Sequence, residues 1–266
     1  MFWHLLKKDW QESTFRFLLN ASLIVVIFAL LYYFIERQTP FAFLLSIPLV
    51  FLHLFYMFFS IIFSLRKEWK ERTVYFWFNM PIAGWKLLLS KFTVAYFQFA
   101  ISLLITMFMI SFLFERAMNQ LPETFSEEVF LVLEVLQALL REFAPVIFLF
   151  ISQGAIQIGL AGLFIYVMSK VIKPLGWLIG IIITFIFNYI YSWFTDTAVY
   201  SAITSWGEIF RLGDLPEHLL LQMNLEGVDP VIMKTPIYAG YFLVEVVIII
   251  LIFWAISWLF DRKVQI

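Results

Sequence analysis

Six apolar stretches alternate with more polar segments along the chain. They cover residues 17–35, 41–65, 92–114, 146–168, 175–194 and 237–260. The hydrocarbon core of a bilayer is about 30 Å thick and a crossing helix needs roughly 20 apolar residues, so each stretch is long enough to cross once. The pattern predicts an all-α integral membrane protein with six transmembrane helices, which uses residues 1–266 as a single domain.

The polar segments predict further elements at the membrane surface. The first fifteen residues are amphipathic, and they predict either a charged anchor for the first span or an elbow helix that lies along the membrane and turns into it. Residues 115–143, between the third and fourth spans, predict an amphipathic helix on the outer leaflet or over the mouth of a transport path. Residues 196–236, between the last two spans, contain glycines, prolines and a short apolar run, which predicts short broken helices.

Composition narrows the class of protein. Of the 266 residues, 63% are hydrophobic and 14% are charged, which excludes a water-soluble domain. Six spans leave no room for a second, catalytic domain. The chain has no cysteine, so disulfides, thiolate metal sites and cysteine nucleophiles are excluded.

The basic residues predict the orientation. Thirteen of the eighteen lysines and arginines lie on one side if the N-terminus, the 66–91 connection, the 170–173 turn and the C-terminal tail share that side. They are Lys7, Lys8, Arg16, Arg66, Lys67, Lys70, Arg72, Lys86, Lys91, Lys170, Lys173, Arg262 and Lys263. Because cytoplasmic loops carry the excess of Lys and Arg, we expect a multi-pass plasma-membrane protein with both termini in the cytoplasm.

The connection between the second and third spans, residues 66–86, has a charged start followed by an aromatic surface. At helical spacing Trp69, Thr73 and Phe76 share one face, and Trp77 lies near it. A short helix of this kind suits docking with another protein. An interfacial helix whose tryptophans lie among lipid headgroups fits the same pattern, so the residues alone leave both interpretations open.

The same connection carries a resemblance to a known family. The run Glu-Trp-Lys-Glu-Arg-Thr at residues 68–73 is followed by Pro81, and then by Ser90 and Lys91 at the start of the third span. It resembles the signature of permease subunits of type-2 ABC exporters, in which an acidic segment ending in Glu-Gly-Thr precedes a Pro at a turn and a Gly-Lys pair. This chain has Arg72 and Ser90 where the family usually has Gly.

The resemblance implies a coupling helix that docks on a separate cytoplasmic ATPase, which binds ATP and Mg. The residues implied in coupling are Glu68, Trp69, Glu71, Arg72, Thr73, Phe76, Trp77 and Pro81. The resemblance also implies that two permease chains, identical or homologous, form the pathway together. The chain has no Gly-x-x-x-x-Gly-Lys-Ser/Thr loop, so a P-loop ATPase would have to be another chain.

Polar residues within the spans are candidates for the pathway or its gate. They are His53, Gln153, Gln157, Asn188 and Glu245. For the neutral residues, hydrogen bonding between helices is the alternative, at about 0.6 kcal/mol per bond on average. Glu245 is costly to bury as an ion, so it either serves substrate passage or is structural, as the protonated acid or paired with His53.

Small residues at four-residue spacing predict close helix packing. Ala155 and Gly159 form one such face, and Gly176 and Gly180 form another. The second face suits contact with another permease chain or packing within one subunit, and the sequence favours neither.

We therefore expect a non-catalytic transmembrane subunit of an ATP-driven exporter, surrounded by lipid and not binding nucleic acid. The alternative is an intramembrane enzyme, or a membrane-bound sensor or assembly factor, that uses the intramembrane polar residues directly. No His-Glu-x-x-His pair and no Gly-x-Ser-x-Gly motif occurs, so the sequence predicts no metal, cofactor or serine nucleophile in this chain.

Overall fold

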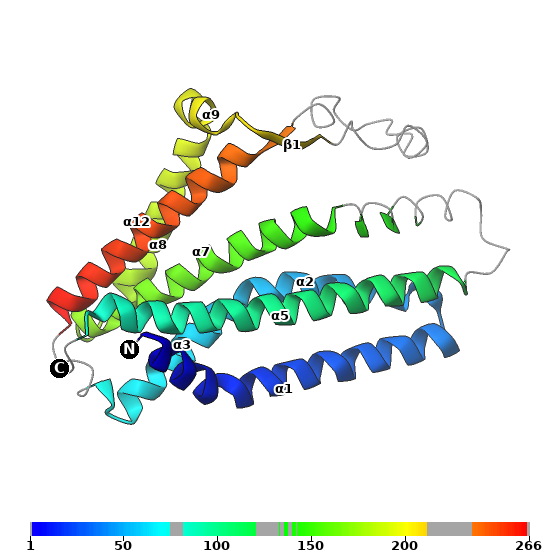
Figure 1. Ribbon diagram of the computed structural model, residues 1–266, viewed down its shortest axis with the longest axis horizontal. Coiled ribbons are helices and arrows are strands. Elements are labelled where there is room, and N and C mark those ends of the chain that lie inside the picture. The colour runs from blue at the N-terminus through cyan, green and yellow to red at the C-terminus, as the bar shows by residue number, and fades with distance from the viewer. Residues whose placement is uncertain are drawn as a thin grey trace.

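The computed structural model describes residues 2–74, 82–120, 133, 136, 137, 140, 141, 143–211 and 236–264 (Figure 1). In this part of the chain, six helical segments are long and apolar enough to cross a membrane. They are α1 (Phe2–Arg37), the stretch Pro40–Lys70, α5 (Gly84–Met118), α7 (Ala144–Val171), α8 (Gly176–Thr195) and α12 (Ala239–Lys263). The prediction of a multi-pass helical membrane protein is confirmed at this level.

The second span is not one regular helix. It consists of η1 (Pro40–Ser46), α2 (Ile47–Leu52), η2 (His53–Phe55) and α3 (Tyr56–Lys70), where η marks 3-10 helix. Thr39 caps the start, since its hydroxyl accepts the backbone N–H of Phe41. The tighter turns of η2 place His53 on the buried side of the span.

Several helices extend beyond the apolar stretches that predicted them. α1 begins at Phe2, so the amphipathic N-terminal residues and the first span form one continuous helix. In Figure 1 the dark blue N-terminal turns of α1 run at an angle to its longer part. α3 continues to Lys70, so the first residues of the predicted 66–86 connection belong to the second span.

The segments opposite the termini differ partly from expectation. In the 196–236 stretch the structure describes one short helix, α9 (Ala198–Thr204), followed by β1 (Glu208–Arg211). β1 pairs antiparallel with β2 (Pro236–Tyr238), directly before α12. The prediction of helices alone is therefore wrong here, because it missed this strand pair. Most of the amphipathic helix predicted within 115–143 lies outside the described residues.

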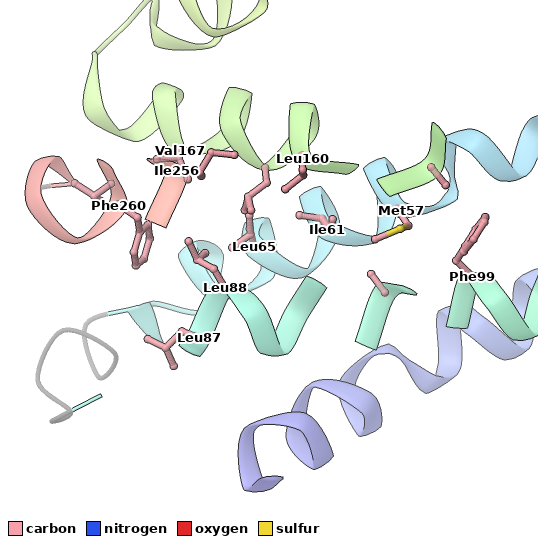
Figure 2. Close-up of a cluster of buried hydrophobic side chains, with 14 of the residues drawn as sticks. Met57, Ile61, Leu65, Leu87, Leu88, Phe99, Leu160, Val167, Ile256 and Phe260 are labelled. Carbon is pink, nitrogen blue, oxygen red and sulfur yellow. The ribbon is translucent and has the colours of Figure 1, made fainter. Parts of the chain in front are cut away.

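The main hydrophobic core joins four spans near the end of the bundle where both termini lie (Figures 1 and 2). Its labelled side chains are Met57, Ile61 and Leu65 of α3, Leu87, Leu88 and Phe99 of α5, Leu160 and Val167 of α7, and Ile256 and Phe260 of α12. A second cluster packs α1 against η1 and α5 toward the other end, around Phe28, Phe43 and Phe114.

Small residues allow the closest helix approaches, all within this one chain. Ala155 is fully buried, and Gly159 lies against Met57 of α3. Gly176 and Gly180 of α8 lie against α7, and a Cβ atom at Gly176 would overlap backbone of that helix. The structure thus uses the Gly176–Gly180 face within the subunit.

Candidate functional site

The end of α3 forms a Schellman motif. Arg72 has a positive φ of 59°, the left-handed conformation that closes such a helix end. The Thr73 N–H donates to the Glu68 carbonyl at 3.1 Å, and the Arg72 N–H donates to the Trp69 carbonyl at 3.3 Å. The chain therefore leaves the helix axis within the segment that resembles the exporter signature.

This turn changes the predicted arrangement of the coupling residues. Because α3 ends at Lys70, Trp69 and Thr73 do not share one helical face, and that prediction is wrong. Glu71 and Arg72 are exposed on the turn. The remaining predicted coupling residues Phe76, Trp77 and Pro81 lie outside the described residues.

Trp69 points into the protein. Its indole packs edge-on against Tyr166 at 5.4 Å and Phe260 at 6.3 Å between ring centroids. The ammonium group of Lys170 lies 5.3 Å from the centroid of the Trp69 ring, a cation–π contact. Trp69 therefore anchors the end of α3 to α7 and α12.

Glu68 also faces inward and is only 2% exposed. Its carboxylate accepts hydrogen bonds from Lys91 at 2.8 Å, from Lys8 at 3.1 Å and from the Thr73 hydroxyl. Lys91, itself 4% exposed, also bonds to the Asp9 carboxylate at 2.8 Å. We call this network of Lys8, Asp9, Glu68, Thr73, Ser90 and Lys91 the buried ion cluster. It ties the ends of α1, α3 and α5 together.

The second oxygen of Asp9 accepts a hydrogen bond from the Ser90 hydroxyl at 2.5 Å. The carboxylates of Asp9, Glu12 and Glu68 also have oxygens within 4.8 Å of one another, close enough for a shared cation. The ammonium groups of Lys8 and Lys91 already supply positive charge to these carboxylates. The arrangement is therefore an ion-pair network, in which each buried charge has an opposite charge beside it.

The start of α5 is held by a residue from the last helix. Ala83, at the N-cap position, makes no side-chain cap, and the Asp261 carboxylate of α12 instead accepts the backbone N–H of Gly84. A Cβ atom at this position would overlap the Asp261 carboxylate and the Phe260 ring, so a larger residue requires these side chains to shift. The connection between α3 and α5 is thus anchored to other helices at both ends.

A second polar site surrounds Glu245, which is 2% exposed within α12. Its carboxyl group accepts hydrogen bonds from the Gln157 amide at 3.0 Å and from the Tyr200 hydroxyl at 3.2 Å. Burial raises the pKa of Tyr200 to about 12, so this hydroxyl keeps its proton and can donate. The neighbouring Gln153 amide donates to the Tyr241 hydroxyl at 2.8 Å.

The predicted pathway residues separate into three places. Gln153, Gln157 and Glu245 lie together, between α7 and α12. Asn188 lies on the exposed surface of α8. His53 of η2 is buried and bonds to Ser102 and Thr106 of α5, so the alternative in which His53 pairs with Glu245 is wrong.

His53 belongs to a satisfied hydrogen-bond network between helices. One ring nitrogen, Nδ1, lies 2.7 Å from the Leu49 carbonyl, which requires Nδ1 to carry a proton. The other, Nε2, lies 3.0 Å from the Ser102 hydroxyl and 3.3 Å from that of Thr106. Asn20 of α1 donates to Ser102 at 2.9 Å. This favours a packing role for His53.

Comparisons with protein-family models, curated proteins and solved structures find no match to this chain.

Proposed function

We propose that the chain is the transmembrane subunit of an ATP-driven ABC exporter. Two such subunits form the substrate pathway, and separate ATPase subunits dock on the connection between α3 and α5. The observation that carries the proposal is the left-handed turn at Arg72, which lies where the exporter signature usually has glycine.

Glycine is the residue best suited to a positive φ, because it has no Cβ to clash with the neighbouring carbonyl. A signature with glycine between its acid and its threonine is therefore suited to a left-handed residue at this point. The chain has that conformation at Arg72, between Glu71 and Thr73. The resemblance thus extends from residue types to the backbone geometry that those types favour.

The buried ion cluster supports a coupling role. Lys91 takes the place of the signature lysine, and it bonds to carboxylates from α1 and α3. A displacement of the exposed turn at Glu71 and Arg72 would therefore be transmitted to α1, α3 and α5 through the ion pairs of the buried ion cluster. Glu68 and Trp69 act in this proposal as anchors within the membrane subunit, and the exposed residues of the turn contact the ATPase.

The N-terminal part of α1 has a place in the same proposal. Lys8 and Asp9 join it to the buried ion cluster. An elbow helix along the membrane surface would then move together with the ends of α3 and α5.

The test removes the exposed acid and an aromatic residue of the connection together. We expect Glu71→Ala combined with Trp77→Ala to abolish co-purification with the partner ATPase, and to abolish ATP-dependent transport. The matched control is Asp196→Ala with Trp193→Ala, an exposed acid and an exposed tryptophan near the opposite end of the bundle. Unchanged association and transport in the first variant would reject the coupling role.

A second candidate is an intramembrane enzyme or sensor, and the convergence of Gln157 and Tyr200 on Glu245 favours it. Activity of the purified chain without any ATPase, lost in Glu245→Gln, would select this candidate over the exporter.

A further inference from the structure

An apolar groove of about 670 Å³ lies between α5 and α12, with Leu160 of α7 also lining it. Its walls include Leu89 and Phe92 of α5 and Ile249, Ile250, Phe253 and Trp254 of α12. The volume falls in the range of small-molecule sites, and the walls are almost wholly hydrophobic.

One end of the groove is aromatic and positively charged. Trp85 and Trp258 line it, one on each helix. The Lys86 ammonium group lies 5.4 Å from the Trp85 ring centroid, and the Arg262 guanidinium group lies 5.3 Å from that of Trp258. Asp261 also lines the groove, and its carboxylate accepts the backbone N–H of Gly84 at the start of α5. Tryptophans and cations in this arrangement are typical of the level of lipid headgroups.

The dimensions match one leaflet of a bilayer. From Ile249 to Arg262, α12 rises about 20 Å at 1.5 Å per residue. Half of the hydrocarbon core is about 15 Å, and the headgroup layer adds about 5–7 Å on each side.

We propose that this groove binds one anionic phospholipid from the leaflet on the side of the termini. An acyl chain lies along the apolar walls between α5 and α12. The phosphate lies between Lys86 and Arg262. Lipid binding at this groove needs no ATPase partner, so its test is independent of the exporter proposal.

The test measures lipid retained by the purified full chain in native mass spectrometry. The probes are phosphatidylglycerol, which is anionic, and phosphatidylcholine, which is not, with matched acyl chains. We expect the wild-type chain to retain one phosphatidylglycerol in preference to phosphatidylcholine. Arg262→Glu weakens binding of phosphatidylglycerol about tenfold, because each surface cation contributes about 1 kcal/mol and the substitution also reverses the charge.

Lys263→Glu is the matched control, since Lys263 is the next residue, is exposed and does not line the groove. It should leave the preference unchanged. Ile250→Trp fills the groove and should lower the retention of both lipids. Equal retention of the two lipids by the wild-type chain, or an equal effect of Arg262→Glu and Lys263→Glu, would overturn the proposal. A wild-type dimer that Ile250→Trp dissociates would assign the groove to a second copy instead, and would also overturn it.

Discussion

Arg72 is the only non-glycine residue with a positive φ among those that the structure describes. For an L-residue this conformation costs about 1–2 kcal/mol, because Cβ crowds the carbonyl that follows. Its side chain is exposed, so the strain is offset by the backbone hydrogen bonds of the turn and not by packing of the arginine side chain. The chain retains this strain at a turn that we propose to meet an ATPase, which is where functional strain is commonly found.

Arg72→Gly should therefore stabilise the protein, by about 0.5–1 kcal/mol after the greater entropy of glycine in the unfolded chain is subtracted. The measurement is the midpoint of thermal unfolding of the purified protein in detergent. Arg72→Ala removes the same side chain but keeps Cβ, so it should not raise the midpoint. Equal midpoints for the glycine and alanine variants would show that the backbone is not strained there.

At this scale the sequence did not predict where the side chains point. The resemblance implies a role in ATPase coupling for Glu68, whose carboxylate is buried against Lys8 and Lys91. These partners are 60 and 23 positions away, so no local spacing shows them. A signal was available, because all three residues lie near the same-side ends of predicted spans.

Helices were predictable because apolar length alone defines a span. The 3-10 segments that interrupt the second span were not predictable in this way. η1 is capped by Thr39, and η2 contains His53, whose hydrogen bonds depend on α5. The strand pair β1 and β2 was missed for a similar reason. Its strands have four and three residues, and they pair across a long sequence separation.

The buried ion cluster joins three helices, and Lys91 is at its centre. Lys91→Met should leave Asp9 and Glu68 as buried charges with too little compensation, which destabilises the protein by about 3–5 kcal/mol. The measurement is the loss of helicity during chemical unfolding. Adding Asp9→Asn and Glu68→Gln to this variant should recover part of the lost stability, because it removes the uncompensated charges.

Lys67→Met is the control for this experiment. Lys67 pairs with Glu12 at 3.4 Å, and both side chains are partly exposed, so the expected loss is below about 1 kcal/mol. Equal losses for Lys67→Met and Lys91→Met would contradict a buried, structurally important cluster.

The whole molecule has both termini at one end of the bundle, as an even number of spans requires (Figure 1). The chain has no cysteine, so single cysteines can be introduced without other substitutions. We expect Glu71→Cys to react with a membrane-impermeant maleimide only in inverted vesicles, because thirteen of the eighteen basic residues share its side. Asp196→Cys should react in intact cells. The reverse pattern would invert the orientation.

The contact between Asp261 and Gly84 links α12 to the start of α5, so a small tilt of α12 at this end produces a larger displacement at its other end. Between Asp261 and Glu245 the helix is about 24 Å long, so a tilt of about 5° about the Asp261 end displaces Glu245 by about 2 Å. The hydrogen bond from Gln157 to Glu245 measures 3.0 Å, so such a displacement away from α7 would break it. If α12 moves as a rigid helix, motion of the connection between α3 and α5 would therefore break the bond between Glu245 and the Gln157 amide, which lies toward the opposite side of the membrane.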